Sequence, residues 1–310
     1  MQQAIILCPI YNDETSFNQF AAAVEKETSA LSDYSFSFLI VNDGSDHLEI
    51  SSGLPLTIVH LHRNLGHQKA IATGLAYAHH KMSFERIIIM DGDGEDNPSD
   101  IGRLLSASTE TIVVARRASR QEGRHFKFSY QVYKFLFNLL TGKKIAFGNF
   151  MALPKKEVDR LVHHSEIWNH LAAAIIKIKR PYVAIDSHRG KRFAGSSSMN
   201  FNSLLLHGLG AIGVFIEVIA TRLLLFSFFM ILVAVLAILI IFYVKYFTDK
   251  AIPGWATTTV SSMLIVILQS FLLSLFTIFL YLSSQGQRKF IPALHYMDYI
   301  RSVETKNNGT

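Results

Sequence analysis

The sequence predicts an α/β domain with a largely parallel sheet, followed by a hairpin of two membrane helices. Short apolar runs alternate with stretches of helical periodicity through the first part of the 310-residue chain. This alternation is typical of parallel sheets that are covered by helices on both faces. Two long runs without a charged residue follow, at 223–244 and 263–282. These two patterns place the main division of the chain near residue 198.

Strands and helices are expected in alternation along the first part. Runs rich in aliphatic and β-branched residues predict strands at Ala4–Pro9, Phe36–Val41, Leu56–Leu61, Arg86–Met90 and Thr111–Ala115. Helical periodicity predicts helices at Thr15–Ala30, Gln68–Lys81 and Pro98–Ala107. Ligands of parallel sheets bind at the carboxyl ends of the strands. The polar residues that follow each strand are therefore the first candidates for a functional site.

The later part of the chain is expected to cross a membrane twice. Each uncharged run is long enough for a hydrocarbon core of about 30 Å at about 1.5 Å per residue. We predict membrane helices at 223–247 and 256–283, an interfacial helix within 199–222 and a cytoplasmic tail at 284–310. No export signal is visible ahead of the domain formed by 1–198, so this domain is expected in the cytoplasm.

Composition narrows the class of protein without naming a function. Half of the residues are hydrophobic, 17% are charged, and the formal net charge is +6. A basic excess of this size suits nucleic acid, anionic lipid and phosphorylated substrates equally well. The single cysteine, Cys8, excludes a disulfide framework and a cysteine-based zinc site, and fits a reducing compartment.

Three polar clusters follow the first, second and fourth predicted strands. They are Pro9–Glu14, Val41–Ser45 and Met90–Asp96. In the third cluster Asp91 and Asp93 alternate across glycines, so both carboxylates can approach one hard cation. Such cations prefer oxygen ligands and bridge to substrate phosphates. The third cluster therefore predicts a divalent-metal site at the edge of the sheet.

The clusters resemble those of the family 2 glycosyltransferases with a GT-A fold, and within them the polyprenyl-phosphate group that includes dolichol-phosphate mannose synthase. The resemblance covers nearly the whole chain. Its further marks are Arg63–His67 before a helix, the basic segment after Val114, Arg192–Ser196 and the C-terminal hairpin. The resemblance implies a GT-A catalytic domain over 1–198.

The resemblance also implies roles for individual residues. The nucleotide-sugar would be bound by Pro9, Tyr11, Asp13, Glu14 and Asp43. Asp91 would lie near the ribose or sugar of the donor, and Asp93 and Glu95 would hold Mg²⁺ or Mn²⁺. Glu95 stands where relatives usually have glutamine. Asn42 replaces the first aspartate of the usual D-D-G-S, which leaves the donor preference open.

A basic segment after the fifth predicted strand suits phosphate groups. Its cations are Arg116, Arg117, Arg120, Arg124 and Lys127. The planar guanidinium fork of arginine matches phosphate oxygens, although a solvated helix start would have the same composition. The family pattern favours Arg117, Arg120 and Lys127, joined by Arg192, as ligands of the acceptor phosphate and donor diphosphate. Arg117 would act in catalysis together with Asp91 and Asp93.

The implied reaction moves a sugar from a UDP- or GDP-linked donor to a polyprenyl phosphate, with inversion of the anomeric carbon. Many relatives carry an aspartate in a strand matched here by Ala146–Phe150, where this chain has Ala146 and Asn149. A phosphate monoester has its second pKa near 6. We therefore expect a dianionic acceptor that needs no general base. A nucleic-acid partner is not expected, and self-association stays open.

Four other classes of protein are alternatives to this hypothesis. They are a glycosyltransferase with a hydroxyl acceptor, a processive polysaccharide synthase, a non-catalytic membrane scaffold and a soluble nucleotidyltransferase. The sequence lacks the Gln-x-x-Arg-Trp motif that is typical of processive synthases, and the predicted membrane hairpin disfavours a soluble nucleotidyltransferase. The G-x-G-x-x-G match at 208–213 follows no strand and predicts no dinucleotide site.

Overall fold

The computed structural model describes residues 1–117, 124–195, 201–248, 254–286 and 289–306. The chain forms two compact units. The sheet unit comprises Met1–Asn138, Lys143–Val214 and Lys289–Thr310, and the hairpin unit comprises Leu139–Gly142 and Phe215–Arg288.

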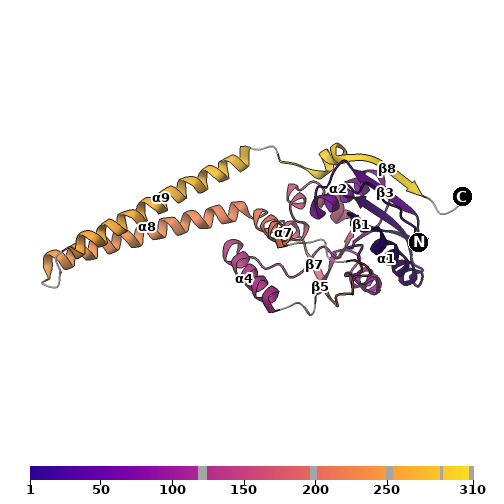
Figure 1. Ribbon diagram of the computed structural model, residues 1–310, viewed down its shortest axis with the longest axis horizontal. Helices are drawn as coiled ribbons and strands as arrows, with labels where there is room; N and C mark the ends of the chain where they lie inside the picture. The colour runs from indigo at the N-terminus through magenta and orange to yellow at the C-terminus, as the bar shows by residue number, and fades with distance from the viewer. Residues whose placement is uncertain (118–123, 196–200, 249–253, 287–288, 307–310) are drawn as a thin grey trace. The chain divides into compact units, whose positions relative to one another are not determined.

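An eight-stranded sheet forms the centre of the sheet unit (Figure 1). Its strands are β1 (Gln2–Ile10), β2 (Tyr34–Asn42), β3 (Leu56–Leu61), β4 (Arg86–Ile89), β5 (Ile112–Arg117), β6 (Met151–Pro154), β7 (Tyr182–Ser187) and β8 (Ile300–Lys306), in the spatial order β7-β5-β6-β4-β1-β2-β3-β8. β1 pairs in parallel with β2 and β4, and β2 pairs in parallel with β3. β6 is antiparallel to both β4 and β5, and β8 is antiparallel to β3.

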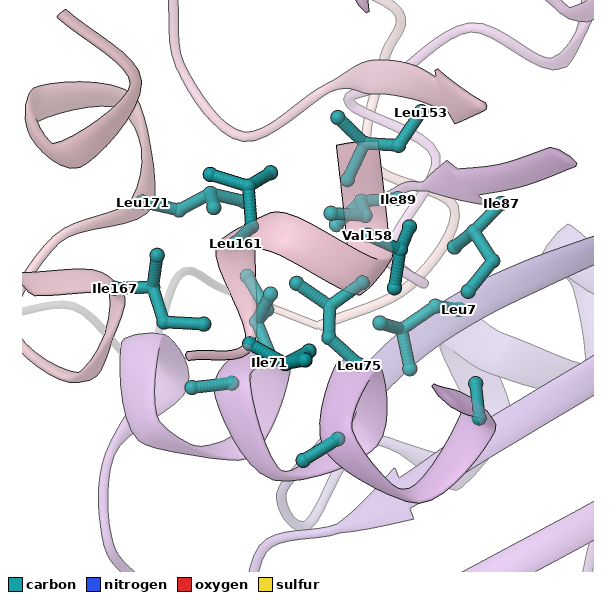
Figure 2. Packing of buried hydrophobic residues seen from close by; sticks show 14 of the residues in the cluster. Leu7, Ile71, Leu75, Ile87, Ile89, Leu153, Val158, Leu161, Ile167 and Leu171 are labelled. Carbon is teal, nitrogen blue, oxygen red and sulfur yellow. The ribbon is translucent and has the colours of Figure 1, made fainter. Parts of the chain in front are cut away.

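Helices cover both faces of the sheet. The helices that supply core residues are α1 (Glu14–Thr28), α2 (His67–Lys81), α3 (Ile101–Ala107), α5 (Lys155–Leu161), α6 (Leu171–Lys177) and α10 (Pro292–His295). The chain also forms α4 (Arg124–Thr141), α7 (Phe201–Gly213) and the short 3₁₀ turns η1 (Pro98–Asp100), η2 (Ser165–Trp168) and η3 (Tyr296–Tyr299). Alternate side chains of β1 enter different cores, because successive residues of a strand point to opposite faces. Leu7 packs with α2, α5 and α6, whereas Ile6 and Cys8 pack with α1 and α3. In Figure 2, Ile71 and Leu75 of α2 point toward α5 in the first of these cores.

Most of the predicted elements of the first part are present. β3 has the predicted bounds, and β1, β2, β4 and β5 differ from them by one or two residues at their ends. The predicted strand at Ala146–Phe150 is wrong, because 143–150 has no regular structure and β6 begins at Met151. β8 was not foreseen: its residues are largely exposed, and its charged residues hide the apolar alternation that marks a strand.

The hairpin unit contains the two longest helices, α8 (Ile216–Phe247) and α9 (Trp255–Gly286). Both are long and apolar enough to cross a membrane, with hydropathies of 3.2 and 2.5 in their most apolar windows. Only 17% and 6% of those windows are buried, so the apolar side chains face outward rather than into a protein core. α8 and α9 are therefore candidate membrane spans. The chain enters the hairpin from the sheet unit and returns to it at Lys289.

Candidate active site

The carboxyl ends of β1, β2 and β4 carry the polar clusters to one edge of the sheet, because these strands are neighbours and parallel. After β1 the backbone turns at Asn12, which has a positive φ of 50° and donates its N–H to Oγ of Ser45 at 2.8 Å. Asp13 follows at the N-terminus of α1. The first two clusters are therefore joined directly.

Asp43, at the end of β2, holds the loop that precedes α2. Its two carboxylate oxygens accept the backbone N–H groups of Leu65 and Gly66, at 2.7 and 2.9 Å. Asp43 is buried, and its own N–H donates to the carbonyl of Ile10. Burial raises the pKa of Asp43, and the two N–H donors offset only part of that rise. Both oxygens of this predicted nucleotide ligand are thus already engaged.

Asn42 has an equally complete set of partners. Its Oδ1 accepts the N–H of Ser45 at 2.8 Å, and its Nδ2 donates to the carbonyl of the same residue at 3.0 Å. Nδ2 also lies 3.0 Å from Nδ1 of His60 on β3. Nε2 of His60 in turn lies 3.3 Å from Oε1 of Glu304 on β8. The asparagine therefore shapes the turn and links strands.

The β4 cluster differs, because it concentrates negative charge. Oδ1 of Asp93 accepts the N–H of Glu95 at 2.8 Å, and its Oδ2 accepts from Nη1 of Arg192 at 2.7 Å. Nη2 of Arg192 pairs with Asp13, so one guanidinium bridges two carboxylates from different strand ends. Burial raises the pKa of Asp93 to about 6, with a further contribution from the charge of Asp91. Arg192 does not cancel this effect.

A second arginine pairs with Glu95. Nη2 of Arg189 contacts Oε2 of Glu95, and both residues line a cavity of about 30 Å³ together with Asp91 and Asn149. A cavity needs about 10–15 Å³ to hold one water molecule, so this cavity has room for a few waters. Most of the residues that line it are polar. Asp91 and Glu95 therefore share a space, and Asn149 from the irregular segment before β6 faces it.

Of the three acidic residues Asp91, Asp93 and Glu95, Asp91 has the fewest hydrogen bonds to its carboxylate oxygens among the described residues. Its N–H donates to Oδ2 of Asp96 at 2.9 Å. Its Oδ1 lies 3.3 Å from Nε2 of His67, within ion-pair distance. The contact does not have hydrogen-bond geometry, and this buried oxygen accepts no hydrogen bond from the described residues. Oδ1 of Asn149 is also buried and likewise accepts no hydrogen bond from the described residues. Two oxygen acceptors around the cavity are thus open to a donor or a cation.

The segment that contains both arginines lies against the β4 cluster. The N–H of Gly190 donates to the carbonyl of Glu95, and that of Phe193 donates to the carbonyl of Asp93, both at 2.9 Å. A Cβ on Gly190 would lie only 2.1 Å from the carbonyl oxygen of Gly94, so this approach requires glycine. Main-chain hydrogen bonds therefore place the two guanidinium groups over the carboxylates.

The other predicted ligands have varied positions. Tyr11 is exposed at 45% and Pro9 is partly buried at the end of β1. Glu14 accepts the N–H of Glu49 and lines a separate, open cavity of about 530 Å³. The side chains of Arg117 and Lys127 and all of Arg120 lie outside the described residues.

Two contributors were missed by reasoning from the sequence. Arg189 had a visible signal, since it is a cation close to Arg192. His67 belongs to the Arg63–His67 stretch, whose resemblance to the family implies no role for it. Its contact with Asp91 depends on how the α2 and β4 ends meet, which no local pattern reveals.

This chain belongs to the family 2 glycosyltransferases: the family described as “Glycosyl transferase family 2” matches residues 5–160 of it. The protein is therefore a glycosyltransferase. The matched region contains most of β1, all of β2 to β6, and with them the three polar clusters. Family membership and the mostly parallel sheet confirm the predicted GT-A class.

Individual relatives are distant. “Uncharacterized glycosyltransferase YkcC” of Bacillus subtilis (strain 168) is 27% identical over 279 residues, which cover 84% of this chain and 83% of the relative. The “Undecaprenyl-phosphate 4-deoxy-4-formamido-L-arabinose transferase” of Yersinia pestis (strain Pestoides F) is 24% identical over 219 residues, or 66% of this chain and 65% of the relative. Among solved structures, mannosyl-3-phosphoglycerate synthase from Rubrobacter xylanophilus has a TM-score of 0.47 at 13% identity, covering 72% of this chain and 74% of that one.

Proposed function

We propose that this glycosyltransferase moves a sugar from a UDP- or GDP-linked donor to a polyprenyl phosphate at the cytoplasmic face of a membrane. The observation that carries the proposal is the acidic cluster of Asp91, Asp93 and Glu95, held against Arg189 and Arg192 at the carboxyl edge of the sheet. Carboxylates beside guanidinium groups suit a donor diphosphate that arrives with a divalent cation.

The acidic cluster fits Mg²⁺ or Mn²⁺. Carboxylate oxygens are the ligands that such cations prefer. Burial, and after it the charge of Asp91, raises the pKa of Asp93, and a bound cation would favour the ionised carboxylate. No group of three metal-binding side chains is arranged as a finished site within the described part of the chain. Asp93 and Glu95 would hold the cation. Arg192 and Arg189 would then exchange their carboxylate partners for phosphate oxygens.

A lipid acceptor is supported by exposed apolar side chains on α4 and α7 and by the two candidate membrane spans. α7 exposes Leu205, Leu206 and Leu209, at 52%, 68% and 51%, although it belongs to the sheet unit. α4 packs on α7 through Tyr133 and exposes Phe135 at 65%. An apolar surface on a polar domain marks an interaction site, and two candidate membrane spans follow directly in the chain. We assign this surface to the lipid.

The reaction needs electrostatic stabilisation more than proton transfer. An oxygen of the lipid phosphate attacks the anomeric carbon, and the bond from that carbon to the donor diphosphate breaks, so that a nucleoside diphosphate leaves. A cation held by Asp93 and Glu95 would neutralise charge on the departing diphosphate. Arg192, and Arg117, Arg120 and Lys127 from the basic segment, would bind phosphate oxygens. Asn149 beside the cavity cannot act as a base, which fits a dianionic nucleophile.

The remaining assignments follow from the same proposal. Pro9, Tyr11, Asp13, Glu14 and Asp43 would shape the nucleotide pocket. Asp43 would do so through the loop that it holds. The catalytic domain would cover 1–198, with the C-terminal residues from Lys289 joined to it through β8. Because both ends of the hairpin lead to the sheet unit, two membrane crossings would leave them on one side.

A transfer assay with chemically defined acceptors tests this function. Purified full-length protein in detergent is incubated with radiolabelled UDP- or GDP-sugars, Mn²⁺, and either undecaprenyl phosphate or undecaprenol. We expect a labelled lipid only with the phosphate, at a rate that chelation with EDTA abolishes. Transfer to the alcohol or to a free sugar instead would refute the acceptor assignment and favour a hydroxyl-acceptor enzyme.

A further inference from the structure

His67 connects two strand ends that the sheet itself does not pair. It is the first residue of α2, which follows the β3 end, and its Nε2 lies 3.3 Å from Oδ1 of Asp91 at the end of β4. The order of strands places β1 and β2 between β3 and β4. His67 therefore reaches Asp91 from across the carboxyl edge.

The position of His67 is fixed by the loop before it. Gly66 precedes α2 with a φ of 93°, a conformation that favours glycine. Its N–H and that of Leu65 both donate to the carboxylate of Asp43, which is buried at the end of β2. This clamp gives the start of α2 a defined place on the sheet. A chain of contacts thus runs from Asp43 through the loop and His67 to Asp91.

His67 is also the side chain that forms an ion-pair contact with the carboxylate of Asp91. Oδ1 of Asp91 is buried and accepts no hydrogen bond from the described residues, and Nε2 of His67 lies 3.3 Å from it. The main chain of Asp91 is held separately, through its N–H to Asp96. The main chain and the carboxylate of Asp91 therefore contact different partners.

Two further histidines influence the surroundings of His67. His170 caps α6, where its Nδ1 accepts the N–H of Ala173, and its ring lies 4.6 Å from that of His207 on α7. Burial lowers the pKa of His170 to about 3 and also lowers that of His207. Both shifts favour the neutral form of these two rings.

We propose that His67 is a positioning residue that orients the carboxylate of Asp91 for the donor, and that Asp43 sets its place through the loop at 65–66. The proposal rests on the proposed function, since it gives Asp91 a task in sugar transfer. His67 would not touch the substrate. It would act through the angle of the Asp91 carboxylate, and small misplacements of a reacting group cost about 100-fold in rate.

Three substitutions of one residue test the proposal. His67→Ala removes the donor, His67→Gln places an amide N–H close to the position of Nε2, and His67→Asn places one nearer to Nδ1. We expect kcat to fall about 10- to 100-fold in His67→Ala and His67→Asn, with the KM for the donor within about twofold of wild type. His67→Gln should recover much of the loss. His163→Ala, at an exposed histidine of the same unit, is the control and should be unchanged.

A purely structural role predicts a different result. Wild-type kcat in His67→Ala, or equal recovery by glutamine and asparagine, would overturn the proposal. Electron cryomicroscopy of the variants gives a second readout that needs no turnover. The Asp91 carboxylate should rotate away in His67→Ala and keep its place in His67→Gln, and an unmoved carboxylate in His67→Ala would also overturn the proposal. A wild-type protein without transferase activity would instead refute the proposed function.

Discussion

Two acidic turns lie at the same edge of the sheet and differ in how completely the side-chain atoms are hydrogen-bonded and in how closely the carboxylates crowd one another. In the turn after β2, each side-chain polar atom of Asn42 and Asp43 has a partner, mostly in the main chain. In the turn after β4, carboxylates crowd one another, the pKa of Asp93 rises to about 6, and a buried oxygen of Asp91 accepts no hydrogen bond from the described residues. The side-chain hydrogen bonds of the first turn are satisfied within the protein, whereas the second turn keeps a carboxylate oxygen that a ligand or a cation could engage.

The difference teaches how to separate structural from functional acidic residues. Both turns follow a buried strand, and both contain an acidic residue next to glycine. A satisfied carboxylate stabilises the fold, because removing it leaves buried N–H groups without partners. A crowded carboxylate costs stability, and enzymes keep such groups for their chemistry. Substitutions in the two turns should therefore have opposite effects on stability.

Asp93→Asn should give the largest effect, on activity. Loss of one charge from the cluster should lower kcat about 100- to 1,000-fold, the range found when one electrostatic stabiliser of a transition state is removed. The transfer assay with undecaprenyl phosphate measures this change. Asp46→Asn, at an exposed aspartate after β2, is the control and should keep wild-type activity. Comparable activity in both variants would place the chemistry elsewhere.

Asp43→Ala should give the largest effect on stability. It leaves the N–H groups of Leu65 and Gly66 without their acceptors, at a cost of about 2–3 kcal/mol. Urea unfolding of the full chain in detergent, followed by fluorescence of Trp168 in a Trp255→Phe background, reports on the sheet unit. Asp43→Asn, which keeps one acceptor, should lose less. A stable Asp43→Ala variant with a weakened donor KM would show instead that Asp43 binds the nucleotide directly.

The stability of Asp93→Asn should depend on pH. The pKa of Asp93 is about 6 in the folded protein, against 3.8 as the ordinary value, so the folded state favours the protonated acid. This contribution is complete below pH 4 and is lost as the pH rises through 6. At pH 8 the neutral asparagine should therefore be more stable than wild type by about 1–2 kcal/mol. The difference should vanish near pH 4 in the same urea experiment, and an advantage independent of pH would contradict the crowding of carboxylates.

Asn42→Asp should give the smallest change. The aspartate that relatives usually have would keep the acceptor for Ser45 but lose the donations to the Ser45 carbonyl and toward His60, so we expect a loss of about 1 kcal/mol. The same urea titration measures it. Donor selectivity among UDP- and GDP-sugars should not change, since this side chain points into the turn. A switched selectivity would show instead that residue 42 influences the choice of donor.

Patterns of local origin were readable from the sequence. The strands β1 to β5 and the helices α1 and α2 carry regular periodicity, and the uncharged runs mark α8 and α9. The acidic cluster was visible because Asp91, Asp93 and Glu95 follow the run of four apolar residues Ile87–Met90. The partners of these carboxylates were less visible. Arg192 was expected to bind phosphate, and its bridge between Asp13 and Asp93 was not foreseen, because it depends on a contact between distant segments.

The contributions that sequence reasoning missed share one physical cause. β8 joins the sheet only after the hairpin, and its pairing with β3 is a long-range contact without an apolar pattern of its own. The clamp of Asp43 on the loop before α2, and the contact of His67 with Asp91, likewise depend on how strand ends converge. Periodicity reports which face of an element is buried, but not which loop will meet it.

The central claim is that the acidic cluster after β4 binds a divalent cation together with the donor diphosphate. Thermal unfolding of the full chain with UDP or GDP, each with and without Mn²⁺, tests it most directly, because a ligand that binds the folded state raises the unfolding temperature. We expect Mn²⁺ and one of the nucleotides to stabilise wild type together, and the joint effect to disappear in Asp93→Asn and Glu95→Gln. An undiminished joint effect in both variants would contradict the account.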